Sequence, residues 1–239
     1  KRRFQTFVGN LARPNYERLG VIAKPDDSYD DTQLRSTIMG LMLYAHDEKY
    51  AADVKAAYGN KHIKDVDANL RWIIGSTLIR DDASLDKEYY RIYNSTPDAA
   101  LKRDLMDAIT NTRDRDILLG YIGKLKDENV VRAQDRLIFY MRLLRNYVVK
   151  DDAFQWMYDN WDWLRTSEGD KTISEYPRFA ASFVRRPEEA EKYKQFFTPL
   201  QSEKILSRDI KIAFSEIDAR LHLIEHDQAA IFDYLAKTA

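Results

Sequence analysis

Two consecutive stretches in the middle of the chain, STPDAALKRDLMDA at residues 95–108 and NTRDRDILLGYIGK at residues 111–124, indicate the fold class. Each begins with small polar residues that can cap a helix and continues with apolar residues at helical spacing. Only two residues separate the stretches. Because so short a connection turns the chain back on itself, the pair predicts an antiparallel helical hairpin.

The same pattern extends in both directions and predicts an all-α chain. Glycine and proline are scarce, 8 and 6 in 239 residues, whereas β sandwiches and barrels need frequent turns. No run alternates apolar and polar residues as a strand would. The predicted helices cover residues 2–19, 30–45, 47–58, 65–80, 84–94, 98–110, 113–126, 132–147, 152–165, 173–184, 187–198 and 203–236. Their short loops favour an irregular α-solenoid, a superhelix of antiparallel helical hairpins similar to HEAT or armadillo repeats.

The predicted helix at residues 152–165 carries apolar side chains on two faces. One face holds Phe154, Met157, Tyr158, Trp161 and Leu164. Trp156 and Trp163 project from the opposite face. A helix that is apolar on both sides is normally enclosed between two layers, so we expect a central helix. The alternative is that the second tryptophan face docks a further domain.

Charge and composition exclude several classes of function. The 38 basic and 39 acidic residues are interspersed and give a net charge of −1, so we expect no nucleic-acid partner. The short basic run Lys1, Arg2 and Arg3 fits the first turn of an amphipathic helix. No apolar run approaches the roughly 20 residues of a membrane span, and we expect no membrane partner. Cysteine is absent, which excludes disulfides and thiolate metal sites and fits a reducing compartment.

One motif has the spacing of a zinc site. His222-Leu223-Ile224-Glu225-His226 matches H-x-x-E-H, in which two histidines one helical turn apart bind zinc and the glutamate activates water. The apolar stripe of this helix comprises Leu206, Ile210, Ala213, Ile217, Leu221, Ile224, Ile231 and Leu235. Both histidines fall on the opposite side, and a catalytic zinc needs an enclosed pocket and a third ligand. We therefore expect exposed surface histidines and no metal site.

The remaining polar candidates have simpler structural explanations. His46 and His62 stand near expected helix ends, where a cation next to the last carbonyl groups is favourable. Four acidic pairs fall at expected helix starts, where capping explains them better than acid–base catalysis: Asp26-Asp27, Asp30-Asp31, Asp81-Asp82 and Asp151-Asp152. Neither a phosphate-binding glycine loop nor a nucleophile elbow is present. The sequence thus predicts no catalytic residues in this chain.

Six segments nevertheless form an ordered set. The first three are Tyr16-Glu17-Arg18-Leu19-Gly20 with Asp31-Thr32-Gln33-Leu34-Arg35, then Asp67-Ala68-Asn69-Leu70-Arg71-Trp72, then residues 96–119, including Thr112-Arg113-Asp114. The last three are Val131-Arg132-Ala133-Gln134-Asp135, then AFQWMYDNW at residues 153–161, then Arg186-Pro187-Glu188-Glu189 through Phe197 before the long terminal helix. In this order and spacing, the segments extend over essentially the whole chain. The chain resembles the C-terminal helical domain of bacterial, zinc-dependent aminopeptidases of the aminopeptidase N type, which are gluzincin metallopeptidases.

The resemblance implies a bowl-shaped superhelix that closes over a zinc-binding catalytic domain and encloses the tail of a peptide substrate. It implies that zinc and the catalytic residues lie in preceding sequence, that no cofactor binds here, and that the enzyme is cytoplasmic. Arg132, Gln134 and Asp135 match a family signature and could line the bowl or cap a helix. The family is expected to carry a cation just before its F-x-x-P-E element. Here that place holds Ser182 or Phe183, with Arg178 one turn earlier.

The first residue is not Met, so we expect a fragment of a longer protein. On this interpretation residues 1–239 form a single C-terminal helical domain, inactive alone, of an enzyme that removes N-terminal residues from peptides. Its partners are the upstream catalytic domain of the same polypeptide and peptide substrates. The alternative, from a different class, is a free-standing α-solenoid scaffold that binds protein segments in its groove. An upstream H-E-x-x-H-x18-E motif would select the first interpretation, and an immediate start codon the second.

Overall fold

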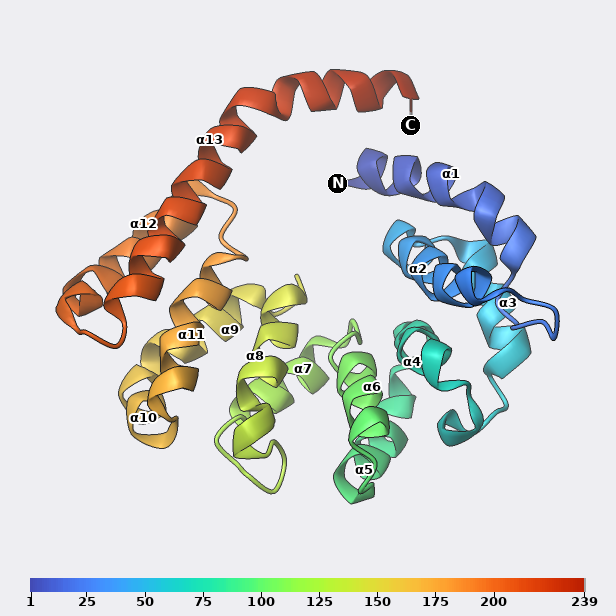
Figure 1. Cartoon of the computed structure of the whole chain (residues 1–239), viewed down its shortest axis with the longest axis horizontal. Helices are drawn as coiled ribbons and strands as arrows, with labels where there is room; N and C mark the ends of the chain where they lie inside the picture. Colours follow the sequence, from blue (N-terminus) through green and yellow to red (C-terminus); the bar gives the residue numbers. More distant parts are fainter. Residues whose placement is uncertain (239) are drawn as a thin grey trace. The chain divides into compact units, whose positions relative to one another are not determined.

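The computed structural model describes residues 1–238, which form thirteen α-helices and four 3-10 helices and contain no strand (Figure 1). The all-α class predicted from the sequence is confirmed. None of the described helices is both long enough and apolar enough to cross a membrane. The chain divides into two compact units, one from Lys1 to Asp114 together with the last residues from Phe232, and one from Arg115 to Ile231. Two units can belong to one structural domain, so the expected single domain stays a prediction.

Unit 1 is built from helical hairpins. Its elements are α1 (Arg2–Leu19), α2 (Tyr29–Ala45), α3 (Glu48–Tyr58), η1 (Ile63–Asp65), α4 (Ala68–Asp81), η2 (Ala83–Leu85), α5 (Asp86–Ser95) and α6 (Ala99–Ile109). Neighbours pack in the pairs α1–α2, α3–α4 and α5–α6, and α4 also contacts both α2 and α6. Hairpins that stack through one helix of each pair are the local pattern of α-solenoids.

Short polar side chains start most helices of unit 1. Asp47, Asp67 and Asp98 each accept a hydrogen bond from a backbone N–H in the first turn of α3, α4 and α6. Such caps satisfy amide groups that have no partner inside the helix. The cap of α2 is Ser28, whose hydroxyl accepts from the Asp31 amide at 3.1 Å.

Unit 2 holds the remaining elements. They are α7 (Arg115–Gly123), η3 (Ala133–Asp135), α8 (Arg136–Arg145), α9 (Lys150–Asp159), α10 (Trp161–Ser167), α11 (Asp170–Ala181), α12 (Pro187–Phe197), η4 (Thr198–Ser202) and α13 (Ser207–Thr238) as far as Ile231. Helix α8 contacts α7, α9 and α11, so it is the central helix of this unit. Its buried side chains include Phe139, Tyr140, Leu143 and Leu144, each 0% exposed.

The predicted helix at residues 152–165 is two helices in the structure. The break falls at Asn160, whose φ of −115° and ψ of 15° depart from helical values. Its side-chain amide donates to the Trp156 carbonyl at 2.7 Å, beside the backbone N–H of the same residue at 3.0 Å. Trp156 and Trp163 are half-buried, with ring centroids 6.4 Å apart. Trp156 also contacts Tyr140 of α8, at 5.8 Å between centroids. The second tryptophan face is therefore partly covered within this chain, which favours the layered arrangement over a docking face.

The long terminal helix begins later than predicted, at Ser207, after the 3-10 helix η4. Its apolar stripe is buried as far as Ile217 and again at Leu235, but Ile231 between them is 50% exposed. A regular stripe in the sequence therefore does not ensure burial, because burial needs a neighbouring helix along the whole length. The predicted starts at residues 65, 84 and 132 are also displaced, since the 3-10 helices η1, η2 and η3 lie at these positions.

Candidate functional site

Arg132, Gln134 and Asp135, matched to the family signature, lie at the start of α8 in unit 2. Arg132 forms an ion pair with Asp135, with 2.5 Å between Nη2 and Oδ2. Gln134 is exposed. The pair holds the 3-10 turn η3 closed, which explains the arginine and the aspartate locally. A role for Arg132 and Gln134 in a peptide channel stays a prediction.

The second candidate pair, Arg178 and Ser182, belongs to the end of α11. The Arg178 guanidinium lies 3.3 Å from a Glu216 carboxylate oxygen of α13, and the Arg178 side chain remains 52% exposed. Ser182 stands at the C-cap of α11, where its hydroxyl donates to the Phe179 carbonyl at 2.6 Å. The structure thus gives both residues partners inside unit 2, and their proposed contact with a peptide stays a prediction.

His222 and His226 are exposed, as the helical wheel predicts. Their ring centroids lie 6.3 Å apart on α13, and the His226 side chain, 76% exposed, contacts Asp227. A zinc site needs a third protein ligand in a shielded position. Across residues 1–238, no three His, Cys, Asp or Glu side chains gather into a group that could hold a metal ion.

The other two histidines differ from each other. His46 does end a helix, as predicted: it closes α2 in the left-handed conformation, with φ of 58°. It is not the cation that the prediction assumed, because burial and nearby basic groups lower its pKa to about 4. The prediction for His62 is wrong, because this residue caps the start of η1 and its Nδ1 accepts from the Lys64 amide at 3.2 Å. A cap of this kind forms where the imidazole nitrogen is an acceptor.

The acidic pairs have structural roles, but helix capping explains only some of these roles. Asp82 caps η2 by accepting from the Ser84 amide at 2.9 Å. Asp30 and Asp31 lie in the first turn of α2, where a negative charge stabilises the helix, although the cap itself is another residue. Asp151 and Asp152 likewise lie in the first turn of α9.

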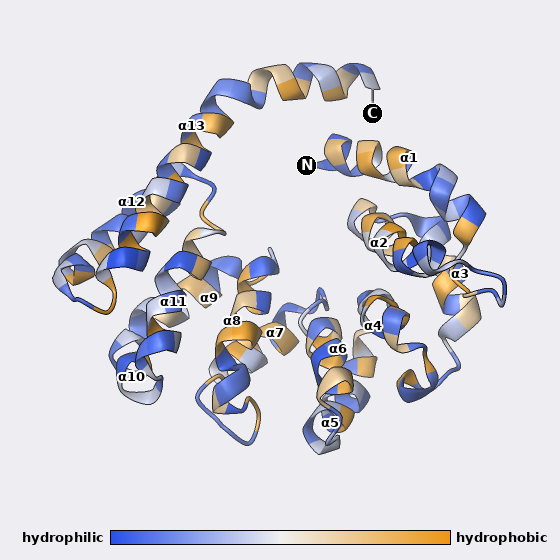
Figure 2. Cartoon of the chain, viewed as in Figure 1, coloured by the Kyte–Doolittle hydropathy of each residue, from blue (hydrophilic) through white to orange (hydrophobic). Residues whose placement is uncertain are grey.

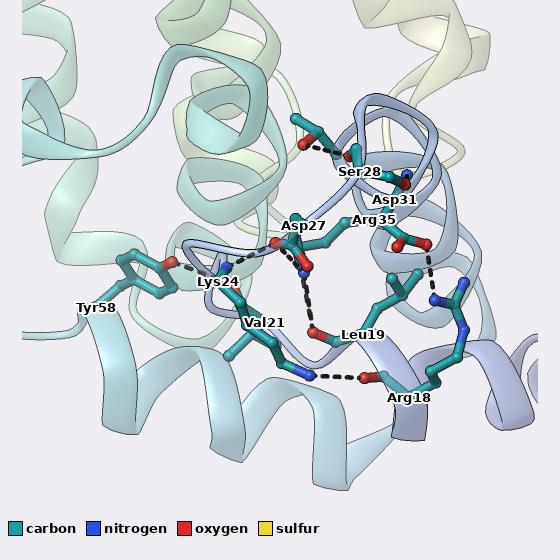
Figure 3. A network of polar contacts seen from close by, with 10 residues as sticks. Arg18, Leu19, Val21, Lys24, Asp27, Ser28, Asp31, Arg35 and Tyr58 are labelled. Carbon is teal, nitrogen blue, oxygen red and sulfur yellow. Dashed lines mark hydrogen bonds and ion pairs between the residues drawn. The ribbon is translucent and has the colours of Figure 1, made fainter.

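Asp27 forms part of a network that the sequence did not predict, around the buried guanidinium of Arg35 (Figure 3). Arg35 is 1% exposed and pairs with Asp27 at 2.7 Å. It also donates to the Leu19 carbonyl at the end of α1, at 3.2 Å from Nη2. The backbone N–H of Lys24 and the guanidinium of Arg35 both stabilise the Asp27 carboxylate and hold its pKa below the usual range. The network fixes the loop between α1 and α2.

Further contacts join this loop to its neighbours (Figure 3). Arg18 pairs with Asp31 at 2.7 Å, and the hydroxyl of Tyr58 donates to the Val21 carbonyl at 3.0 Å. Residues 16–20 and 31–35, which resemble the family pattern, therefore act together to hold the connection between α1 and α2 in place. The sequence did contain one signal for the buried position of Arg35. Ile38 and Met42, three and seven positions later, are buried on the same helix face, so a charged residue shares a face with core residues.

A second buried arginine, Arg136, organises unit 2. It is 1% exposed, pairs with Glu168 at 2.5 Å and donates to the Leu125 carbonyl at 2.9 Å. Its guanidinium also lies 4.8 Å from the ring centroid of Trp163. This arginine directly follows the matched segment at residues 131–135, but nothing in the local sequence identifies its acidic partner.

Together these features define a class of protein: an all-helical domain whose polar clusters are ion pairs and helix caps that hold elements together. Such ion pairs and caps stabilise a fold. The chain belongs to the family described as ERAP1-like C-terminal domain, whose sequence profile matches residues 1–219. The resemblance noted from the sequence is thereby confirmed.

Individual relatives agree with this assignment. The chain is 29% identical to an aminopeptidase N of Lactococcus lactis subsp. lactis and 29% identical to an aminopeptidase N of Lactobacillus helveticus, in each case over 95% of this chain. It is 23% identical to aminopeptidase 2 of Candida albicans over 98% of its length. It spans only 27%, 28% and 26%, respectively, of the length of these three relatives.

Proposed function

We propose that this chain is the accessory C-terminal domain of an aminopeptidase that removes N-terminal residues from peptides. The observation that carries the proposal is the unequal coverage of the relatives. Proteins named aminopeptidase N match 95% of this chain, while the chain corresponds to about a quarter of their length. The family profile, which describes a C-terminal domain, agrees with that position.

On this proposal, the catalytic reaction takes place in the part of the enzyme that precedes Lys1. We expect zinc and the catalytic residues there, since the described residues of this chain contain no group of three metal-ligating side chains. The catalytic domain of the same polypeptide is then the main partner of this chain. The absence of cysteine fits a reducing compartment, and the proposed location is the cytoplasm.

The proposed role of this chain is to cap the active site as a bowl-like superhelix and to enclose the peptide tail. Arg132, Gln134, Arg178 and Ser182 are the proposed contacts to that tail. The side chains of Arg132 and Arg178 are 47% and 52% exposed, although each also binds one carboxylate. A guanidinium carries five N–H donors, so either residue has protons left for a peptide carbonyl or carboxylate.

The first experiment compares the 239-residue chain with the full-length enzyme on aminoacyl-nitroanilides in the presence of zinc. We expect turnover only from the full-length enzyme. Turnover by the isolated chain that survives His222→Ala and His226→Ala would contradict the proposal. Turnover that both substitutions abolish would assign a zinc site to α13 instead. A start codon directly before Lys1 would favour the free-standing scaffold.

The second experiment tests the tail contacts in the full-length enzyme with Arg178→Ala and Arg132→Ala. We expect KM for peptides of about ten residues to rise roughly threefold to tenfold, the range of a partly solvated charge-assisted hydrogen bond. KM for aminoacyl-nitroanilides should not change, because these substrates have no tail. Arg165→Ala is the matched control, since Arg165 is also exposed in unit 2 and pairs with Glu203. Equal effects on short and long substrates would contradict the assignment.

A further inference from the structure

Unit 1 exposes a group of aromatic rings close to the first residue of the chain. This aromatic patch consists of Phe4 and Phe7 of α1, Tyr44 of α2 and Tyr234 near the end of α13. The Phe4 ring lies 6.1 Å from that of Tyr44, and the Phe7 ring lies 6.1 Å from that of Tyr234. Figure 2 shows hydrophobic residues in these first turns of α1.

The rings of the aromatic patch remain open to solvent although they touch one another. Phe4 is 43% exposed, Tyr44 is 42% exposed and Tyr234 is 56% exposed. Single exposed apolar side chains are normal on a protein surface, whereas contiguous apolar patches mark interaction sites. Tyrosine and phenylalanine are also enriched in the buried centres of protein interfaces.

Basic groups lie at the edge of the aromatic patch, around His46, which follows Tyr44 by two residues. The Arg113 guanidinium contacts the His46 imidazole. Burial, followed by the nearby cations Arg113, Arg80 and Lys1, lowers the pKa of His46 to about 4, so the ring is neutral at pH 7. Arg113 therefore faces a neutral ring, whereas Arg13 and Arg71 in the same unit pair with aspartates.

The C-terminal end of α2 explains why Arg80 lies here, but it does not explain Arg113. Cations are favourable near the last carbonyl groups of a helix, and Arg80 donates to the Leu43 carbonyl there at 3.2 Å. The guanidinium of Arg113 contacts the imidazole of His46 in place of a carboxylate. A carboxylate from a partner would complete this cluster, because guanidinium groups bind carboxylates in a two-pronged geometry.

We propose that the aromatic patch and Arg113 together form the docking surface for an acidic, partly apolar segment of the polypeptide that precedes Lys1. The inference rests on the proposed function, in which a catalytic domain comes before this chain. Phe4 lies within one helical turn of the first residue, so the preceding segment starts beside the patch. Such a tether raises the effective concentration of the segment to the millimolar range, and a small patch then suffices for stable docking. The cations at its edge require a segment that carries Asp or Glu.

The test places the photo-crosslinking amino acid p-benzoylphenylalanine at position 4 or position 44 of the full-length protein. We expect cross-links to residues that precede Lys1 in the same polypeptide. The matched control is the same substitution at Tyr29, which is 78% exposed in unit 1 and lies outside the patch. The yield at positions 4 and 44 should exceed that at position 29 by about fivefold or more, since a docked segment is held locally.

A charge reversal tests the acidic character of the partner. Arg113→Glu should lower the cross-link yield from position 44 by roughly tenfold, whereas the same reversal at the exposed Arg103 of α6 should not. Circular dichroism verifies that both variants remain helical. Cross-links to a second copy of the chain, or a yield equal to the Tyr29 control, would overturn the inference.

Aminoacyl-nitroanilide turnover, measured on the same full-length protein before cross-linking, separates the two proposals. An active enzyme without the expected cross-links would refute the docking surface and leave the proposed function standing. Cross-links to the preceding segment in a protein without aminopeptidase activity would refute the function and support the docking surface.

Discussion

Units 1 and 2 each contain one buried arginine, and the two differ in where the acidic partner comes from. Arg35 and Arg136 are both 1% exposed, and both donate to a carbonyl group that follows or ends the preceding helix. The partner of Arg35 is Asp27, in the loop that joins α1 to α2. The partner of Arg136 is Glu168, 32 residues away. The first network fixes one hairpin, whereas the second holds together elements that are distant in the sequence.

The two acidic partners, Asp27 and Glu168, also differ in the hydrogen bonds and the solvent contact that remain when the arginine is removed. Asp27 still accepts a hydrogen bond from the Lys24 amide at 2.6 Å, and its side chain is 10% exposed. The side chain of Glu168 is only 5% exposed. Removing one member of a buried ion pair is costly because the other charge stays desolvated. The same substitution should therefore have a larger effect in unit 2 than in unit 1.

The largest effect is expected for Arg136→Met, which leaves Glu168 buried without its cation. We expect a loss of about 3–5 kcal/mol in the free energy of unfolding of unit 2. Urea unfolding can be followed by tryptophan fluorescence, since Trp163 lies against the substituted guanidinium. The double variant Arg136→Met, Glu168→Gln should recover part of the loss, because no buried charge remains. A loss below about 1 kcal/mol would show that the pair is solvated.

Arg35→Met in unit 1 should shift the urea midpoint in the same direction but by a smaller amount. Asp27 keeps its backbone hydrogen bond and can take up water, while the Leu19 carbonyl loses a donor. Fluorescence of Trp72, in α4 of the same unit, reports the transition. An effect equal to that of Arg136→Met would remove the proposed difference between the two networks.

Two glycines extend the comparison to the backbone. Gly20, directly after α1, has φ of 65° and ψ of −171°, a conformation that is essentially restricted to glycine. Gly120 lies inside α7, and a Cβ atom would meet nothing within 4 Å at either position. Gly20→Ala should destabilise unit 1 by about 1–3 kcal/mol. Gly120→Ala should stabilise unit 2 by about 0.5–1 kcal/mol, because alanine favours the helix. Thermal unfolding measures both, and destabilisation by both variants would contradict the backbone argument.

The smallest effect is expected from pH. The Asp27 pKa is lower in the folded state than in the unfolded chain, so its contribution to stability is present above the unfolded value and is lost as the pH falls through the folded value. Unit 1 should therefore lose stability below about pH 4. Asp27→Asn should make this acid loss shallower while it lowers stability at pH 7. An unchanged slope of the unfolding temperature against pH would show that this carboxylate does not contribute.

The sequence predicted the class and much of the helix pattern because helical periodicity and capping are local properties. It also predicted that His222 and His226 are exposed, since a wheel relates them to residues of the same helix. It was wrong at Asn160, where the backbone leaves the helical conformation inside a strongly periodic stretch. The sequence did not reveal that Arg35 is buried, because a charged side chain is normally exposed, although Arg35 shares the helix face of Ile38 and Met42.

By itself, the sequence determined that this chain is all-helical, that it resembles an aminopeptidase C-terminal domain and that His222 and His226 are exposed. Each of these conclusions depends on the order of residues within a short window. Only the tertiary structure decided which charges are buried and which rings stay open. The pairing of Arg136 with Glu168 joins residues 32 positions apart, and the aromatic patch joins both ends of the chain. Contacts over such distances depend on how helices pack, and spacing within one helix does not reveal them.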